Sequence, residues 1–256
     1  MAEMRVALTV DVEGDFGTDS LRGVDDMMPV LLDGFDRHGV RAVLFVVGDV
    51  AKRRPALLRE AASRGHEIGS HTMTHRALGS ASLEVKRTEL RESKALLEDI
   101  TGAPCSGFRA PYFDVPADLG PLLEDAGYVW SSSKAPFSPI GGYRDLRATR
   151  AVHRLSGSSV VEVPVPSTLG LPIPEGLSYR RLFWPATALA TSPPRVFYVH
   201  PYELLDEAAD FSLSPYMKPF MTLRMGAWAR RHLFALIEGW TARGAVFGPP
   251  DLGGTP

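Results

Sequence analysis

Apolar residues change their spacing along this chain, and each change marks an expected strand or helix. Residues 5–10 are rich in apolar and β-branched side chains and lead into an acidic loop with a glycine, which is typical of a buried strand. Residues 24–35 place apolar side chains at helical spacing, and Gly39 favours a helix end just beyond them. A second apolar run predicts a strand at residues 41–47.

The rest of the first half continues this alternation. Helices are predicted at residues 55–64, 82–100 and 116–126, and strands at residues 67–69, 107–109 and 128–131. A repeated strand and helix order requires parallel strands with helices packed outside them. The sequence therefore predicts an α/β protein that closes into a distorted (β/α) barrel, with its parallel strands inside the helices.

The second half is less regular. Pro, Gly and Ser interrupt residues 134–174, and we expect a loop-rich insertion over about residues 134–194 that covers one face of the barrel. The further elements predicted are strands at residues 159–163, 195–200 and 245–247 and helices at residues 179–190 and 222–243. The sequence has no repeat of fixed period and no convincing linker, so residues 1–256 are expected to form a single domain.

Composition excludes several classes of function. The chain has 28 basic and 30 acidic residues and a formal charge of −2, so we do not expect a nucleic-acid partner. Cys105 is the only cysteine, so any metal must be bound by histidine and carboxylate. The N-terminus lacks a secretion signal, and no apolar run approaches the roughly 18 residues of a membrane span. The expected location is the cytoplasm.

His71 and His75 form the most informative polar pair. We interpret this H-x3-H spacing as two imidazoles on the same side of a helical turn, close enough to bind one cation. The alternative is a capped helix start with two exposed or core-satisfied histidines. Asp11 and Glu13 follow a buried strand and can supply the carboxylates that the pair lacks, although such a segment can also be a solvated turn. Together they suggest a metal-assisted hydrolase.

Two more polar residues follow predicted strands. Arg109 begins an Arg-Ala-Pro-Tyr run, and His200 precedes a proline. In isolation, the first is better explained as a surface arginine on a rigid loop, and the second as a histidine that bonds a backbone carbonyl. In parallel α/β folds, however, ligands collect where the C-terminal ends of the strands meet. One active site is therefore expected to hold all of these residues.

Taken in order, these segments resemble the successive motifs of the polysaccharide deacetylase, or NodB-homology, family of carbohydrate esterases. The segments are residues 9–13, 70–75, 109–112 and 199–201, and the resemblance runs from about residue 5 to about residue 247. It implies a distorted (β/α) barrel with fewer strands than a full TIM barrel. It also implies a divalent metal, usually zinc, bound by one carboxylate and two histidines.

The resemblance assigns expected roles to residues of this chain. His71, His75 and Glu13 become the metal ligands, with Asp15 as an alternative carboxylate. Asp11 matches the catalytic base. Arg109 is expected to pair with the base, and His200 to protonate the leaving amine. The backbone N–H of Tyr112, beside Pro111, is expected to lie against the developing oxyanion.

The chain departs from the family pattern in one region. Family members carry an acidic residue that tunes the catalytic histidine, whereas residues 127–133 here contain no carboxylate. Glu203 and Glu162 are alternative partners for His200. The acid role of His200 therefore depends on which carboxylate replaces the missing one.

The predicted activity is metal-dependent removal of an N-acyl group, most simply N-acetyl, from a sugar or glycoconjugate. The alternatives are a metal-independent cyclic amide or ureide hydrolase of the same fold and a catalytically silent carbohydrate-binding protein. For a cytoplasmic enzyme, a lipid-linked or nucleotide-linked sugar is the expected partner. Residues 164–174 and 183–194, with Arg180 and Arg181 between them, could cover a lipid phosphate or lie on a membrane surface. The favoured alternative is a Pro-rich loop packed on the barrel.

Overall fold

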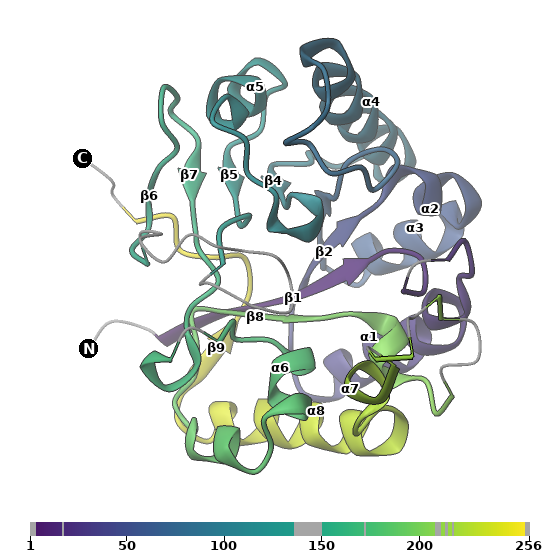
Figure 1. Cartoon of the computed structure of the whole chain (residues 1–256), viewed down its shortest axis with the longest axis vertical. Coiled ribbons are helices and arrows are strands. Elements are labelled where there is room, and N and C mark those ends of the chain that lie inside the picture. Colours follow the sequence, from purple (N-terminus) through teal and green to yellow (C-terminus); the bar gives the residue numbers. More distant parts are fainter. Residues whose placement is uncertain are drawn as a thin grey trace.

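One curled sheet organises the protein, as the computed structural model in Figure 1 shows. The structure describes residues 4–16, 18–135, 150–171, 173–207, 211–212, 215–216 and 218–253. Within these residues nine strands pair in the order β6-β7-β5-β4-β3-β2-β1-β8, and β9 pairs with the first residues of β1. Every pair is parallel except β6 with β7. The predicted α/β architecture, a distorted (β/α) barrel, is confirmed.

The bounds of the elements follow the predicted alternation in the first half. The strands are β1 (Met4–Val12), β2 (Val43–Val46), β3 (Glu67–Ser70), β4 (Gly107–Phe108), β5 (Trp130–Ser131), β6 (His153–Arg154), β7 (Val161–Glu162), β8 (Val196–Val199) and β9 (Ala245–Phe247). The helices are α1 (Met28–Arg37), α2 (Gly48–Arg53), α3 (Pro55–Ser63), α4 (Leu83–Thr101), α5 (Leu119–Asp125), α6 (Leu177–Leu182), α7 (Lys218–Thr222) and α8 (Gly226–Thr241). One-turn helices lie at Gly23–Met27, Pro111–Phe113, Thr168–Gly170, Ala186–Leu189 and Pro201–Leu204.

Alternation along the strands gives the sheet an apolar outer face and a mixed inner face. On β1, Val6, Leu8 and Val10 belong to the large core between the sheet and the surrounding helices. The intervening residues face inward, where Ala7 joins a smaller core cluster. Further members of that inner cluster come from four other strands and from α6 (Val43, Phe45, Trp130, Val161, Tyr179, Val196 and Tyr198). The inner face of β1 therefore leads directly to Asp11 and Glu13.

Two predicted helices of the second half are wrong in extent. The helix expected at residues 179–190 is instead α6, which ends at Leu182, followed by a separate turn at Ala186–Leu189. Pro185 explains the break, because proline lacks the N–H that a continuing helix needs and disfavours helical backbone in the residue before it. The helix expected at residues 222–243 starts only at Gly226, because Arg224 adopts a positive φ of 54°.

The insertion contributes more to the sheet than its composition suggested. Strand β6 was not predicted, and β7 pairs with β5 and extends the parallel sheet. Val163 and Val165 are buried in the inner core cluster. Residues 136–149 of the predicted insertion lie outside the described residues. Among the helices that the structure describes, none is both long and apolar enough to cross a membrane.

Candidate active site

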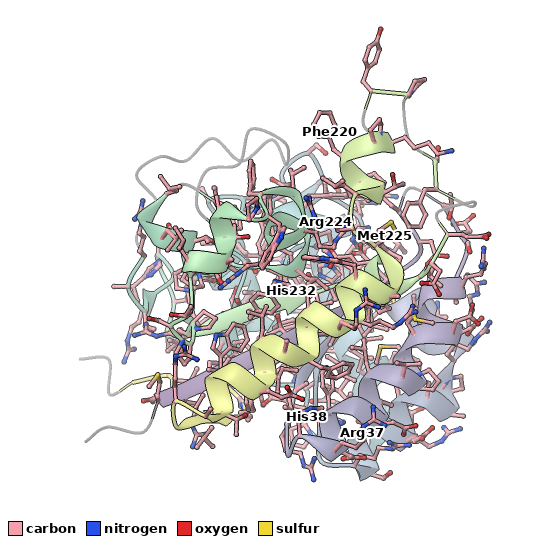
Figure 2. The ribbon with its side chains drawn as sticks, turned by 90° about the horizontal axis from the view of Figure 1, so that it is seen from below. Arg37, His38, Phe220, Arg224, Met225 and His232 are labelled. Atoms are coloured by element: carbon pink, nitrogen blue, oxygen red, sulfur yellow. The ribbon has the colours of Figure 1, made fainter. Side chains whose placement is uncertain are left out.

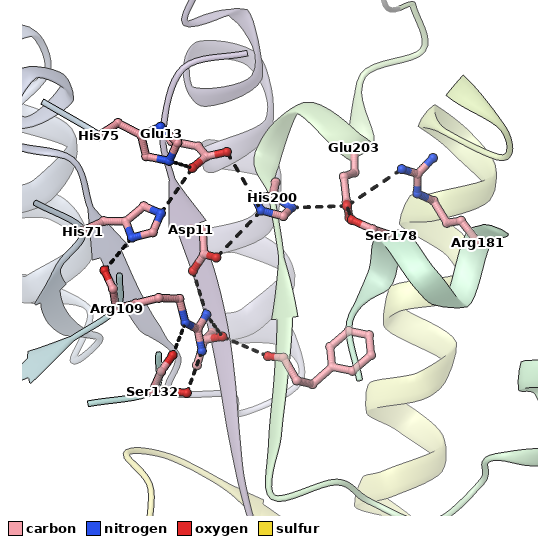
Figure 3. Close-up of polar contacts among 12 residues, drawn as sticks. Asp11, Glu13, His71, His75, Arg109, Ser132, Ser178, Arg181, His200 and Glu203 are labelled. Atoms are coloured by element: carbon pink, nitrogen blue, oxygen red, sulfur yellow. Dashed lines mark hydrogen bonds and ion pairs between the residues drawn. The ribbon is translucent and has the colours of Figure 1, made fainter. Parts of the chain in front are cut away.

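Parallel strand ends bring the predicted site residues together inside the curled sheet (Figure 3). Asp11 and Glu13 lie at the end of β1, and His200 follows β8, which pairs directly with β1. Arg109 follows β4, three strands away. Its guanidinium crosses the inner face over the Phe45 ring, at 4.4 Å from the ring centroid, to reach Asp11. The inward curl of the sheet makes this reach possible.

Glu13, His71 and His75 converge as the sequence predicted. Glu13 Oε2 lies 2.6 Å from His75 Nε2 and 3.3 Å from His71 Nε2. One ligand atom from each residue lies within 4.8 Å of the others. Two imidazole nitrogens and one carboxylate oxygen are a donor set that zinc and similar divalent cations accept, with open positions for water and substrate.

The predicted helical turn between the two histidines is wrong. His71 directly follows β3, and the chain then turns through left-handed backbone at Thr72, with φ of 65°, and at His75, with φ of 58°. Glu89 on α4 holds this turn, because its carboxylate accepts hydrogen bonds from the N–H groups of Met73 and Thr74, each at 2.8 Å. The tight turn, and not a helix face, brings the two imidazoles together.

Hydrogen bonding fixes which nitrogen of His71 faces the site. Its Nδ1–H donates to the carbonyl of Arg109 at 2.8 Å, which leaves Nε2 with a lone pair toward Glu13. Burial opposes ionisation of Glu13, but the nearby charges of His75 and His200 and the hydrogen bond from His75 hold its pKa well below its usual range. Burial lowers the pKa of His75, and the adjacent Glu13 carboxylate outweighs this and raises it. The cluster thus favours an ionised carboxylate.

Asp15 is hydrogen-bonded within the loop after β1 and is not part of the Glu13 cluster. Its side chain is buried, and its two oxygens accept hydrogen bonds from Ser20 Oγ at 2.7 Å and from the N–H of Gly23 at 2.9 Å. These bonds close the loop between β1 and α1. The alternative that Asp15 supplies the metal carboxylate is therefore not supported by its contacts, whereas Glu13 has the required position.

Asp11 and Arg109 form a fully buried ion pair. Arg109 Nη1 donates to Asp11 Oδ1 and to Thr9 Oγ1, both at 2.7 Å. The rest of the guanidinium is bound by Ser132, through its carbonyl at 2.9 Å and its hydroxyl at 3.0 Å. The surface-arginine alternative is wrong, since Arg109 is completely buried. The side chain is held on three sides and presents a fixed charge to Asp11.

His200 lies between the two carboxylates of β1 and a third one, Glu203. Its Nε2 is 3.7 Å from Asp11 Oδ2 and 3.9 Å from Glu13 Oε1, and its Nδ1 is 3.3 Å from Glu203 Oε1. Burial alone would lower the pKa of His200. The hydrogen bond to Glu203 and the neighbouring carboxylates prevail and raise that pKa to about 9. The imidazolium is therefore the favoured form at neutral pH.

Glu203 is the carboxylate that accompanies His200, and Glu162 is not. Glu162 instead accepts hydrogen bonds from the N–H groups of residues 133 and 134. Glu203 is completely buried in the one-turn helix that follows β8. It also accepts a hydrogen bond from Ser178 Oγ and lies 3.8 Å from Arg181 Nη2. These contacts, seen in Figure 3, link the His200 side of the site to α6.

Sequence reasoning missed Glu89 and Ser178, and it did not foresee the contact of Arg181 with Glu203. Glu89 had a detectable signal, because it shares the buried face of α4 with Leu90, Ser93 and Leu97 at helical spacing. A carboxylate on such a face is rarely left without a buried partner. Ser178 and Arg181 had no comparable signal, because their contacts depend on how α6 lies against β8.

The backbone at Tyr112 is held in an uncommon conformation. The one-turn helix Pro111–Phe113 contains positive φ values at Tyr112, 57°, and Phe113, 52°. The backbone bonds of the turn run from the N–H of Phe113 to Ala110 and from the N–H of Asp114 to Pro111. Neither uses the N–H of Tyr112. Its ring packs edge-on against His75, with centroids 4.8 Å apart, so this turn borders the ligand cluster.

A cavity of about 730 Å³ opens above these groups. Asp11, Glu13, His71, His75 and His200 line its floor. Arg180 and Arg181, expected beside a lipid phosphate, are both buried. Arg180 donates to Glu175 at 2.8 Å, and Arg181 to the carbonyl of Leu223 at 2.7 Å. Both charges are therefore engaged inside the protein, as expected for the favoured alternative in which this region packs on the barrel, and Arg181 also lines the cavity.

Comparison with known proteins identifies related sequences over the first half of the chain. The model of the polysaccharide deacetylase family matches residues 2–130, half of the chain. A chitooligosaccharide deacetylase of Sinorhizobium fredii is 39% identical over 117 residues, which cover 44% of this chain and 54% of the relative. A peptidoglycan-N-acetylglucosamine deacetylase of Bacillus cereus is 28% identical over 110 residues, 43% of this chain and 37% of the relative. The matched region thus spans about half or less of these relatives.

Solved structures share the fold over nearly the whole chain. A family 4 carbohydrate esterase from Streptomyces lividans, solved in complex with acetate, aligns with a TM-score of 0.59 at 15% identity and covers 97% of this chain and 94% of that one. A CE4 family pseudoenzyme from Bacillus anthracis aligns with the same TM-score at 13% identity, covering 94% and 62%. At such identities the likeness establishes the fold alone.

Proposed function

The chain belongs to the polysaccharide deacetylase family, and we propose that it is a metal-dependent hydrolase that removes an N-acyl group from an amino sugar. The observation that carries this proposal is the convergence of Glu13, His71 and His75 next to Asp11 and His200. The named activities of its relatives, deacetylation of chitooligosaccharides and of peptidoglycan N-acetylglucosamine, support the same chemistry. N-acetyl is the simplest acyl group consistent with them.

The three ligand residues fit a divalent cation, most simply zinc. The His71 tautomer fixed by the Arg109 carbonyl points a lone pair toward the cluster, and the ionised Glu13 provides the negative charge. When bound, the cation would polarise the acyl carbonyl and lower the pKa of a water molecule. The chain's own residues would then supply proton transfer and the placement of the substrate.

Asp11 is proposed as the general base. Its Oδ1 is bound to Arg109, whereas Oδ2 faces His200 and the cavity, so one oxygen is fixed and the other can take a proton from the attacking water. Arg109 orients the carboxylate through this bond. The N–H of Tyr112, beside Pro111, is the proposed donor to the oxygen on which negative charge develops, since its own turn does not use it.

His200 is proposed as the general acid. Its Nε2 faces both β1 carboxylates across the cavity floor, and its Nδ1 bond to Glu203 favours the protonated ring. A protonated Nε2 can deliver its proton to the amine nitrogen as the C–N bond breaks. Glu203 thereby fills the place of the acidic residue that residues 127–133 lack.

Metal content and product release test the proposal together. We expect purified protein to contain about one divalent cation per chain and to release acetate from N-acetylglucosamine derivatives; chelation should abolish release, and added zinc should restore it. Glu13→Gln should lower both metal content and activity, the latter by about 1,000-fold, because the ligand set would be incomplete. Asp15→Asn is the matched control, because this buried carboxylate contacts the loop and not the cluster.

The same experiment separates the alternatives. Activity that survives complete metal removal would favour a metal-independent cyclic amide or ureide hydrolase. Sugar binding without hydrolysis, by protein that does contain the metal, would favour a catalytically silent carbohydrate-binding protein. Retention of metal in Glu13→Gln would contradict the ligand assignment.

A further inference from the structure

The two sides of the cavity differ in chemistry. On one side, the loop after β1 and helix α2 contribute the polar residues Thr18, Asp19, Asp49 and Arg53, together with the apolar residues Phe16, Leu21 and Val50. Helices α6 and α7 contribute Ser178 and Arg181 and four further residues, which we call the apolar wall: Tyr179, Leu182, Phe220 and Met221. The first side therefore combines charged and apolar groups, whereas the apolar wall offers mostly hydrocarbon and aromatic surface.

Polar groups next to the apolar wall are already engaged inside the protein. Ser178 donates its hydroxyl to Glu203. Arg181 directs its guanidinium to the carbonyls of Met221 and Leu223 and lies near Glu203. Sugar hydroxyls lose bonds to water when they bind, so they require polar partners from the protein. These two side chains do not supply them.

Helix α7 is held at the edge of the cavity although it has no buried residue. It is five residues long, and Phe220 is 53% exposed. The buried Arg181 bonds the carbonyl groups at its C-terminal end, and Arg224 Nη1 donates back to the carbonyl of Arg181 at 3.1 Å. Figure 2 shows Phe220 on α7, beyond the end of α8 that begins after Met225. This attachment keeps a large aromatic side chain at the entrance to the site.

We propose that the apolar wall binds an alkyl or aryl group of the substrate, so that the enzyme prefers hydrophobic conjugates of an N-acyl amino sugar to sugar oligomers. The proposal rests on the proposed function, because it concerns the substrate of the same site. The apolar group can be carried in two ways, as the aglycone of the sugar or as an extended N-acyl chain. Both would cover Phe220 and Met221 and remove apolar surface from water.

The test compares kcat/KM of the zinc-loaded protein for a series of substrates below their critical micelle concentrations. The series consists of the methyl and octyl β-glycosides of N-acetylglucosamine, the methyl glycoside of N-octanoylglucosamine, and chitotetraose. We expect at least one octyl conjugate to exceed the N-acetyl methyl glycoside by about tenfold or more, since each buried methylene favours binding by roughly fourfold. Whichever octyl conjugate gains identifies the group that the wall accepts.

Substitutions at and near the apolar wall test whether the preference for octyl conjugates arises there. Phe220→Ser should reduce the ratio of kcat/KM for the octyl conjugate to that for the methyl glycoside by about fivefold, because the largest apolar contact is lost. Leu223→Ser is the matched control: Leu223 is also exposed and lies just beyond α7, but it does not line the cavity, so the ratio should stay unchanged. Thermal unfolding of each variant verifies folding.

Several results would overturn the inference. If chitotetraose is hydrolysed much faster than either octyl conjugate, or if the octyl and methyl substrates react equally, the proposed function stands and the apolar preference fails. An unchanged ratio in folded Phe220→Ser would show that any preference arises elsewhere. If none of the substrates is hydrolysed, the proposed function fails, and the inference that rests on it fails as well.

Discussion

The two halves of the site are built from different kinds of structure. The first half consists of residues from strand ends and their following turns within residues 2–130, the region that the family model matches: Asp11, Glu13, His71, His75 and Arg109. The second half comes from β8, the one-turn helix after it, and α6: His200, Glu203, Ser178 and Arg181. Parallel pairing fixes the first set, whereas short helices and side-chain contacts position the second.

The two halves also differ in the residues that they contribute to the proposed reaction. The first half contains the proposed ligand cluster and the proposed base, which lie at the ends of parallel strands and in the turns that follow them. The second half contains His200 as the proposed acid, the carboxylate of Glu203 beside it and, on α6, part of the apolar wall. We infer that the first half determines the reaction and that the second determines how strongly protonated the acid is and which substrates fit.

Outside the proposed ligand cluster, the largest effect is expected from the bond between Arg109 and Asp11, the proposed base. Arg109→Ala should reduce kcat by about 100-fold to 1,000-fold, because Asp11 would lose its orienting bond inside a buried site. Metal content should change little, because the bond to His71 comes from the backbone carbonyl of residue 109 and survives the substitution. Kinetics and elemental analysis of the same preparation measure both quantities.

A second variant guards against simple unfolding. Removing one partner of a buried ion pair typically costs about 3–5 kcal/mol, so Arg109→Ala needs a stability measurement. Arg109→Lys keeps the charge but loses the bonds to Ser132, and should give an intermediate kcat. A parallel loss of metal and activity in folded Arg109→Ala would refute the assigned role and leave Arg109 as a support of the ligand cluster.

A smaller effect is expected from Glu203 in the second half. Glu203→Gln should lower kcat by about 10-fold to 100-fold, part of what acid catalysis typically contributes. Glu203 raises the pKa of His200, and an acid works only while protonated, so activity is lost as pH rises through that pKa. Without the carboxylate, the alkaline limb of the kcat/KM profile should therefore move to lower pH.

Glu175→Gln is the matched control for Glu203. It removes another buried carboxylate of the same half, one that binds Arg180 and Thr168 and not His200. Its stability should fall while its alkaline limb stays in place. If Glu203→Gln and Glu175→Gln give the same pH profile, Glu203 is a packing element and does not tune His200.

The first half could be predicted because its signals are local. Alternation along β1 placed Asp11 and Glu13 on one face of the strand, and the order of strands and helices required their meeting with the residues after β3 and β4. The histidine pair was predicted correctly as a cluster but with the wrong backbone. Positive φ at Thr72 and His75 has no sequence signal, because neither residue is a glycine or asparagine.

The second half could not be predicted to the same depth. Glu162 and Glu203 were equal alternatives as partners of His200, and the choice depends on how the one-turn helix after β8 folds back on α6. The break in the predicted helix at residues 179–190 could have been foreseen from Pro185, but the attachment of α7 through Arg181 could not. Such contacts join segments that are distant in sequence, and the hydrophobic pattern of neither segment indicates its partner.

The smallest effect is expected from acid, which acts through one histidine in each half of the chain, outside the two halves of the site. Burial, with Arg41 near His66 in the first half and Arg180 near His232 in the second, lowers the pKa of each histidine from 6.5 to about 4. Between those values the unfolded chain takes up protons that the folded protein does not, so the free energy of unfolding falls as pH falls through this window. We expect each histidine to contribute a loss of about 1 kcal/mol between pH 7 and pH 5, after allowing for partial exposure.

Urea unfolding at pH 7 and pH 5 measures this loss. His66→Asn should weaken the pH dependence while keeping an acceptor for the N–H of Ala42, which bonds His66 Nδ1 at 3.0 Å. His232→Asn should weaken it by a similar amount, although it also loses the stacking on Trp228. The two reductions should add in the double variant if the halves respond independently. If the free energy of unfolding of the double variant depends on pH as strongly as that of either single variant, acid destabilises both halves of the chain in one step. The two halves would then not differ in their response to acid.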